Sequence, residues 1–282
     1  MDGRYVVGVD GSAPSDAAVR WAIERAEREQ RQVVLAHVRD PEAGMMGADF
    51  ARDEDQHAAQ LLRRLQEEFA GAAVELSVEL LEGPVAWALG SAVMADDIVV
   101  VGTHKIGFLH GRVLGSRSVQ IASGVPCSVA VIPDVDLRFR RGVVAGVDRV
   151  EIDAEIAHVA AAEADARGEE LIVIQAVHAG DARRSELPVG IAESAARAMF
   201  PTLSVRSRVT TRPAAEALLD AALDKALLVL GPGSGDPQRS PIGSVLHDVL
   251  LNVNAPVLVA RRASDRELVG PVAHQDAGPS GE

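Results

Sequence analysis

The sequence has few cysteines, no long apolar runs and few aromatic residues, and each of these shortages limits the class of protein to which it can belong. It has one cysteine in 282 residues, which excludes an intrachain disulfide. No apolar run approaches the roughly 20 residues that a membrane-spanning helix needs, and Met1 to Arg4 lack the layout of a secretory signal. Aromatic residues make up only 3% of the chain, so valine, alanine and leucine must fill the core. We therefore expect a cytoplasmic globular protein.

Positive charge is also scarce. The chain has 28 lysines and arginines against 41 aspartates and glutamates, which gives a formal net charge of −13. A strongly acidic chain is repelled by phosphate backbones and by anionic lipid surfaces. The composition thus argues against nonspecific binding of nucleic acid and against binding to a membrane.

Several motifs of catalysis and cofactor binding are absent as well. The sequence contains no G-x4-G-K-[ST] run and no G-x-G-x-x-G after a strand, so neither a P-loop NTPase nor a dinucleotide enzyme is indicated. It has no closely spaced pair of histidines or cysteines that suggests zinc, and Asp96 and Asp97 are typical of a solvated turn. Spacing alone assembles no Ser-His-Asp triad. We expect no enzyme, with a weak ATPase activity left open.

Short apolar runs alternate with helical patterns along the first half of the chain. The runs lie at 5–9, 33–38, 74–80, 98–101 and 129–132, and helical stretches occupy 15–29, 50–69, 84–94 and the region after Gly115. This alternation is typical of a parallel sheet with helices on both faces. The run at 74–80 alternates apolar and polar residues, which predicts a strand near the edge of the sheet.

The same order of elements then returns. Asp148 follows an apolar run as Asp10 does, and Gly243-Ser244 repeats Gly115-Ser116. The period is about 130–140 residues, too long for a solenoid and typical of a tandem duplication. We expect two five-stranded units at 1–137 and 138–262, and a polar, disordered tail at 263–282.

A glycine-rich loop between two buried strands is the clearest candidate for a binding site. It contains Gly102, Gly107 and Gly115, and Gly115-Ser116 opens a helix. Glycines let backbone N–H groups approach a ligand, and a helix start presents unpaired donors to an anion. Between 102 and 118 the loop has three cations and no carboxylate, against the trend of the chain. This pattern favours a phosphate ligand; the alternative is a surface loop with incidental charges.

These motifs resemble those of the universal stress protein family. The resemblance depends on Asp10-Gly11-Ser12 after the first strand and on a G-x2-G-x9-G-[ST] pattern after the fourth, and it covers 4–133 well and 142–262 more loosely. It implies open sheets of strand order 3-2-1-4-5 and units that pair through their fifth strands. It also implies ATP or AMP binding, as in some members of the family, and stress-linked regulation rather than a defined catalytic reaction. Mg²⁺ accompanying ATP would need only a phosphate and one carboxylate.

Matched position by position, the resemblance assigns a nucleotide site to the first unit. Asp10 falls on the acidic position near the nucleotide, Val38 falls where the chain passes the base, and Ser118 matches a small hydroxyl. Lys105 replaces the middle glycine, where it could contact a phosphate while Gly107 supplies the bend. The expected cofactor-binding residues are Asp10, Gly11, Ser12, Val38, Gly102, Thr103, Lys105, Gly107, Gly115, Ser116, Arg117 and Ser118.

The second unit departs further from the pattern. Arg149-Val150 replaces the Gly-Ser after Asp148, and Asp236 and Arg239 leave its loop without a net charge. We expect nucleotide binding chiefly in the first unit, with the second as a structural partner. The alternative is a scaffold that binds no nucleotide and acts through protein contacts. Whether the chain is a monomer with an internal pseudo-dimer or a homodimer is open at this stage.

Overall fold

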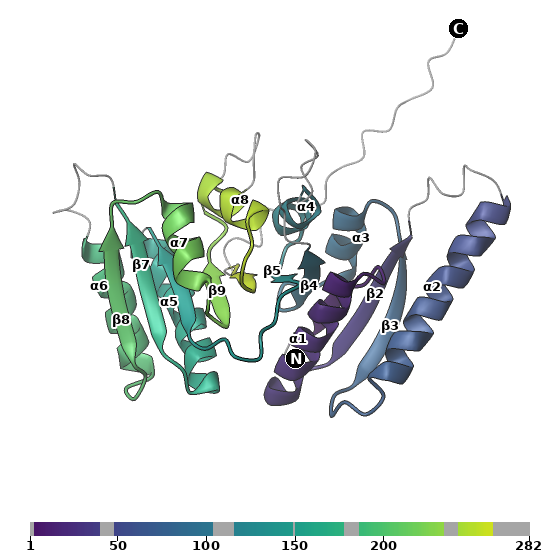
Figure 1. Ribbon diagram of the computed structural model, residues 1–282, viewed down its shortest axis with the longest axis horizontal. Helices are drawn as coiled ribbons and strands as arrows, with labels where there is room; N and C mark the ends of the chain where they lie inside the picture. The colour runs from purple at the N-terminus through teal and green to yellow at the C-terminus, as the bar shows by residue number, and fades with distance from the viewer. Residues whose placement is uncertain are drawn as a thin grey trace, which may run out of the picture.

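The protein is built on one open ten-stranded sheet. The computed structural model describes residues 3–39, 48–103, 116–148, 150–177, 186–233 and 242–261, and in this part of the chain the strand order is β3-β2-β1-β4-β5-β10-β9-β6-β7-β8. The two halves of the chain form the two halves of the sheet, the first at the right of Figure 1 and the second at the left.

The first half contains five parallel strands. The strands are β1 (Tyr5–Gly8), β2 (Val33–Arg39), β3 (Leu76–Glu82), β4 (Ile98–Thr103) and β5 (Ser128–Pro133). The helices are α1 (Ala13–Glu29), α2 (Ala48–Glu68), α3 (Val85–Ala92) and α4 (Ser116–Gly124). The order β3-β2-β1-β4-β5 confirms the predicted topology, and β3 lies at the edge, as its alternating pattern predicts.

The second half repeats this arrangement. Its strands are β6 (Val143–Val147), β7 (Leu171–Ala176), β8 (Val205–Thr210), β9 (Leu227–Leu230) and β10 (Val257–Val259). Its helices are α5 (Val150–Arg167), α6 (Glu186–Met199), α7 (Ala214–Ala222) and α8 (Ser244–Leu251). The order β8-β7-β6-β9-β10 is again 3-2-1-4-5 within the half. The unit boundaries near 137 and 262 stay predictions, and the expected tail lies outside the described residues.

The two halves meet where β5 and β10 pair antiparallel. Val131 is opposite Val257, and Val129 is opposite Val259. All other strand pairs of the described sheet are parallel. The chain therefore joins its fifth strands internally.

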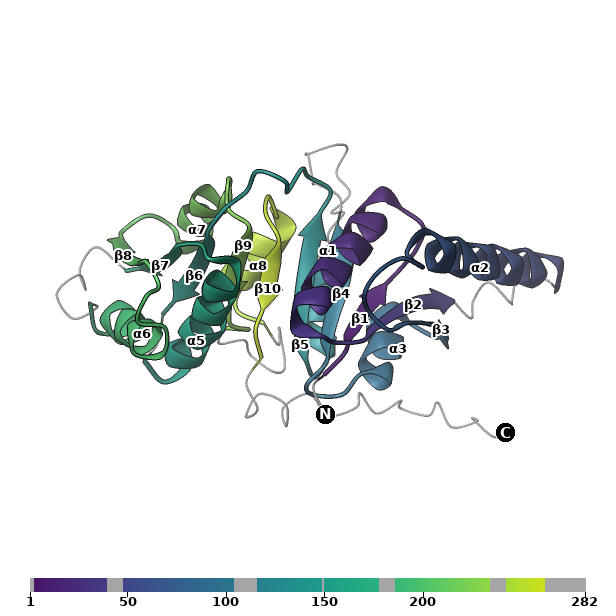
Figure 2. The same cartoon turned by 90° about the horizontal axis from the view of Figure 1, so that it is seen from below.

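Each face of the sheet has one apolar cluster that runs through both halves. One face is covered by α1, α2, α5 and α6, and the other by α3, α4, α7 and α8. Figure 2 shows α1 and α3 on opposite sides of the first half of the sheet, and α5 and α7 on opposite sides of the second half. Successive side chains of a strand point to opposite faces of the sheet, so each strand contributes to both clusters. Val7 and Ala130 belong to the first cluster, whereas Val6 and Val129 belong to the second. The halves thus share their cores rather than merely touching.

Local capping explains why α1 begins at Ala13 rather than at the predicted residue 15. The side chain of Ser12 accepts a hydrogen bond from the Ser15 backbone N–H at 3.4 Å, and Pro14 stands in the first turn. Serine is a preferred N-cap residue, and proline is tolerated in the first turn, where a backbone N–H has no helical partner. Ser12 is therefore the cap, and the helix starts directly after the Asp10-Gly11-Ser12 turn.

Asp97 corrects the expectation of a solvated turn before β4. The residue is only 3% exposed. Its carboxylate accepts hydrogen bonds from the Arg4 backbone N–H at 2.7 Å, the Arg4 Nη2 at 2.9 Å and the Met94 backbone N–H at 2.9 Å. Burial alone would raise the pKa of Asp97, but the hydrogen bonds from Arg4 and Met94 outweigh it and lower that pKa. The carboxylate thus ties the entrance of β1 to the entrance of β4.

We expect Asp97→Asn to lower the free energy of unfolding by about 2 kcal/mol at neutral pH, because charge-assisted hydrogen bonds are lost. A carboxyl with a lowered folded-state pKa stabilises above its unfolded pKa, and that contribution disappears as the pH falls through the folded pKa. The difference in free energy of unfolding between wild type and variant should therefore shrink as the pH falls below about 4. Urea denaturation at several pH values measures it, with Glu24→Gln on the exposed face of α1 as a control. A gap independent of pH would contradict this account.

Candidate functional site

The turn after β1 holds Asp10 in a fixed position at the carboxyl end of the sheet. Gly11 has a φ of +78°, which glycine adopts without strain. The Asp10 Oδ1 accepts hydrogen bonds from the Ser12 backbone N–H at 3.0 Å and the Ser12 hydroxyl at 2.6 Å. The Asp10 backbone N–H donates to the Ser15 Oγ at 3.4 Å. The D-G-S motif therefore builds both the helix cap and the acidic group of the site.

The electrostatics of this turn connect it to the start of α4. Burial alone would raise the pKa of Asp10, but hydrogen bonds from Ser12 and Ser15 and the positive charge of Arg117 lower it. Asp10 is therefore ionised at neutral pH, and Arg117 is close enough to act on it. Two predicted site residues that are 107 positions apart in the sequence thus lie at one edge of the sheet, where the charge of Arg117 acts on the Asp10 carboxylate.

Gly102 lets the end of β4 approach the start of α1. A Cβ at this position would lie 2.2 Å from the Pro14 carbonyl oxygen and 2.6 Å from the Ser15 backbone nitrogen. Thr103, the last residue of β4, pairs in register with Pro133 of β5. Both residues stand at the carboxyl end of the sheet, as predicted.

The end of β2 completes the described part of the site. Val38 is half-buried there and packs against the cluster that α3 and α4 cover. The neighbouring His37 has its Nδ1 2.7 Å from the Val9 carbonyl oxygen, so its ring is hydrogen-bonded to the residue that follows β1. The ends of β1, β2 and β4 and the start of α4 therefore surround one region, where ligands bind in open parallel sheets.

The remaining predicted residues are described in part. Ser118 is 5% exposed on α4, and Arg117 beside it is exposed. Ser116 begins α4. Lys105, Gly107 and Gly115 lie outside the described residues, so their roles stay predictions.

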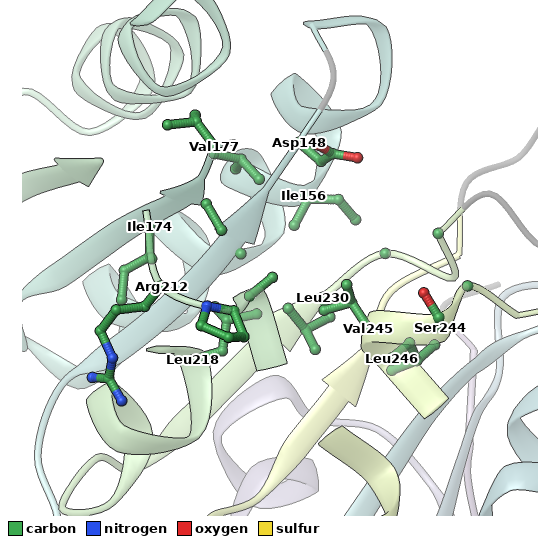
Figure 3. A pocket seen from close by; sticks show the side chains of 18 of the residues that line it. Asp148, Ile156, Ile174, Val177, Arg212, Leu218, Leu230, Ser244, Val245 and Leu246 are labelled. Carbon is green, nitrogen blue, oxygen red and sulfur yellow. The ribbon is translucent and has the colours of Figure 1, made fainter. Parts of the chain in front are cut away.

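The second half contains a cavity of about 590 Å³ at the matching place (Figure 3). Asp148, Gly231, Gly243 and Ser244 all line it. These residues match Asp10, Gly102, Gly115 and Ser116 by position in the repeat. The sequence assigns this half a structural role, although Asp148 and Gly243-Ser244 repeat the motif of the first half. The cavity itself was missed because its remaining wall comes from apolar side chains of several elements, which form no motif.

Cys127 is a buried free cysteine. Burial raises the pKa of the Cys127 thiol to about 11, so it stays protonated at neutral pH. The described residues form no cluster of three or more His, Cys, Asp or Glu side chains suited to a metal ion. Nor is any helix in the described ranges sufficiently long and apolar to cross a membrane.

Comparison with known proteins extends the likeness over nearly the whole chain. The sequence model of the universal stress protein family matches residues 2–133. Universal stress protein Rv2005c of Mycobacterium tuberculosis is 30% identical over 289 residues, which covers 92% of this chain and 97% of that protein. A universal stress protein of Mycolicibacterium smegmatis is 29% identical and covers 91% of this chain and 96% of its own length.

The solved structures agree on the fold. A universal stress protein from Archaeoglobus fulgidus superposes with a TM-score of 0.73 at 17% identity, covering 92% of this chain and 98% of that one. A structure from Pseudomonas aeruginosa has a TM-score of 0.65 at 16% identity, with 95% and 96% covered. The relatives share both halves and their order, and the chain belongs to the universal stress protein family.

Proposed function

We propose that this protein is a regulatory protein of the stress response that binds an adenine nucleotide, ATP or AMP, chiefly in its N-terminal half. The observation that carries the proposal is that the fixed carboxylate of Asp10 and the start of α4, with Arg117, stand at the same carboxyl edge of the parallel sheet. One end of this region offers a fixed carboxylate, and the other offers a cation at the start of a helix.

The two ends suit the two ends of a nucleotide. An ionised carboxylate accepts hydrogen bonds from ribose hydroxyls, and Val38 gives an apolar contact for a base. The N-terminus of α4 and the guanidinium of Arg117 favour phosphate groups, since both present donors and positive charge. Lys105 would add a further cation, and Mg²⁺ would accompany ATP through phosphate oxygens.

A regulatory rather than a catalytic role fits the chemistry of Asp10. Its lowered pKa makes it a weak general base for activating water. Its Oδ1 already accepts two hydrogen bonds from Ser12. We therefore propose that nucleotide occupancy, and not turnover, sets the state of the surface that a partner protein contacts.

The rival function is a scaffold that binds no nucleotide. The internal pairing of β5 with β10 favours it, because that pairing alone gives the two halves a stable mutual arrangement. The two functions differ in one measurable property, which is the affinity of the chain for Mg-ATP.

Calorimetry on the full chain is expected to show saturable Mg-ATP binding at about one site per chain. Arg117→Ala should weaken ATP binding at least about tenfold, because a charge-assisted phosphate contact contributes about 1.5 kcal/mol or more. The same variant should change adenosine binding little, whereas Asp10→Asn should weaken both ligands. Asp148→Asn is the matched control in the second half and should leave ATP binding unchanged. If the folded protein does not bind ATP at millimolar concentration, the nucleotide-binding function is wrong and the scaffold function replaces it.

A further inference from the structure

The cavity of the second half has the size of a small-molecule site. Its volume of about 590 Å³ falls within the range of ligand pockets in proteins, and it lies at the carboxyl ends of β6, β7 and β9. Protein interiors are otherwise packed nearly as densely as organic crystals. A space of this size at the switch point of an open sheet is therefore a candidate site in its own right, separate from the site of the first half.

Among the described residues, apolar side chains form most of the wall of this cavity, and Thr211 and Ser244 add polar groups. Ile156, Ile174, Leu218, Leu230 and Leu246 contribute to it, and each is 5% exposed or less in the protein. Figure 3 shows these side chains arranged around the space, from α5, β7, α7, β9 and α8. Burying an apolar ligand against such a wall is favourable in proportion to the area removed from water.

Among the described lining residues, Arg212 is the one cation, and it is already paired with carboxylates. Arg212 is 2.7 Å from the Asp220 carboxylate and 3.8 Å from that of Glu216, and its guanidinium points away from Leu230 and Val245 (Figure 3). The Gly243 backbone N–H donates to the Pro232 carbonyl oxygen at 2.9 Å. Asp148 is exposed and brings a negative charge. The start of α8 presents backbone donors to the cavity, but the described lining supplies no unpaired cation for a phosphate.

The repeat makes the contrast with the first half direct. Arg117 and Ser118 follow the Ser116 that opens α4, whereas Val245 and Leu246 follow the Ser244 that opens α8. The cation and the hydroxyl of the first site are thus replaced by two apolar side chains at matched positions. Val245 is 38% exposed and Leu246 is 2% exposed. The replacement removes a cation and a hydroxyl from this edge of the sheet and leaves two apolar side chains.

We propose that the second half binds an uncharged, largely apolar small molecule in this cavity, so that the chain has two ligand sites of different chemistry. This inference does not depend on nucleotide binding in the first half. It gives the second half a binding role that its motif, with Arg149-Val150 in place of Gly-Ser, does not indicate.

The test is a titration of the full chain with Nile red, an uncharged apolar dye whose emission rises and shifts to the blue in apolar surroundings. We expect saturation at one dye per chain, and excess Mg-ATP should not displace the dye. Ala176→Phe fills the cavity from the end of β7 and should weaken dye binding at least tenfold. Val245→Arg places a cation at a partly exposed position of the wall and should weaken it at least fivefold.

Two controls keep the result specific. Phe139→Ser removes an 86% exposed aromatic ring outside the cavity and should leave dye binding unchanged. Thermal unfolding followed by circular dichroism shows whether Ala176→Phe folds, and Val245→Arg carries the test if it does not. The proposal is overturned if Mg-ATP displaces the dye stoichiometrically, if binding is not saturable, or if Val245→Arg leaves it unchanged. Because ATP binding is measured on the same samples, failure here is distinguishable from failure of the nucleotide site.

Discussion

Replacing Arg25 with glutamate is expected to lower the free energy of unfolding by about 3–5 kcal/mol, because it removes a buried ion pair and leaves the new carboxylate facing that of Glu163. The side chain of Arg25 is 3% exposed, and its Nη1 donates to the Glu163 Oε2 at 2.5 Å. Its Nε donates to the Tyr5 hydroxyl at 3.0 Å, and its guanidinium lies 4.7 Å from the centre of the Trp21 ring. The pair joins α1 of the first half to α5 of the second.

The position of this ion pair in the repeat also bears on which halves can pair with each other. Arg25 and Glu163 stand at matched positions, each fifteen residues after the aspartate that follows the first strand of its half. The next matched positions along these helices have the opposite charges, Glu29 in α1 and Arg167 in α5. Two first halves in the same arrangement would bury arginine against arginine, and two second halves would bury glutamate against glutamate. The charges therefore favour the pairing of unlike halves.

A double-mutant cycle separates the ion pair from the packing. Arg25→Glu and Glu163→Arg should each destabilise strongly, while the double variant should recover at least half of the sum in urea denaturation. Arg20→Glu on the exposed surface of α1 is the control and should change stability by less than about 1 kcal/mol. If the double variant is as unstable as the sum of the single variants, the stacking of Arg25 on Trp21, and not the charge pair, determines the stability.

Sequence patterns predicted the fold well, because the fold follows from local periodicity. Alternating strands and helices, the edge pattern at 74–80 and the tandem repeat lead to the observed strand order. The patterns did not predict which acidic residues are buried. Asp97 was expected in a solvated turn, yet its partner Arg4 is 93 positions away and only the pairing of β1 with β4 brings them together. The Arg25–Glu163 pair depends in the same way on the meeting of two helices.

In the candidate site too, features set within one turn were predictable from the sequence, whereas features set by contacts between distant segments were not. Asp10, Gly11 and Ser12 act within one turn, so their motif alone indicated their arrangement. The nearness of Arg117 to Asp10 follows from parallel topology, which sequence reasoning could infer. The apolar cavity of the second half could not be inferred, because Ile174, Leu218 and Leu230 come from separate elements and each has the appearance of an ordinary core residue.

Gly102→Ala tests the link between the fold and the site, and we expect it to lower the free energy of unfolding by about 3 kcal/mol. The new Cβ would lie 2.2 Å from the Pro14 carbonyl oxygen, 2.3 Å from its carbon and 2.6 Å from the Ser15 nitrogen. These atoms are backbone, so no side-chain rotation relieves the contact. The start of α1 must move away from β4, and the hydrogen bond from the Asp10 N–H to the Ser15 Oγ must lengthen.

The displacement should therefore reduce ATP binding together with stability, although Gly102→Ala removes no group that contacts a ligand by its side chain. Gly190→Ala is the matched control, since nothing lies within 4 Å of a Cβ built at that position of α6. In a helix interior it should stabilise the protein by about 0.5–1 kcal/mol and leave ATP binding unchanged. Urea denaturation and calorimetry on the same samples measure both quantities. If Gly102→Ala retained full stability, α1 would be free to shift on the sheet, and the close approach of β4 to α1 would not be what positions Asp10.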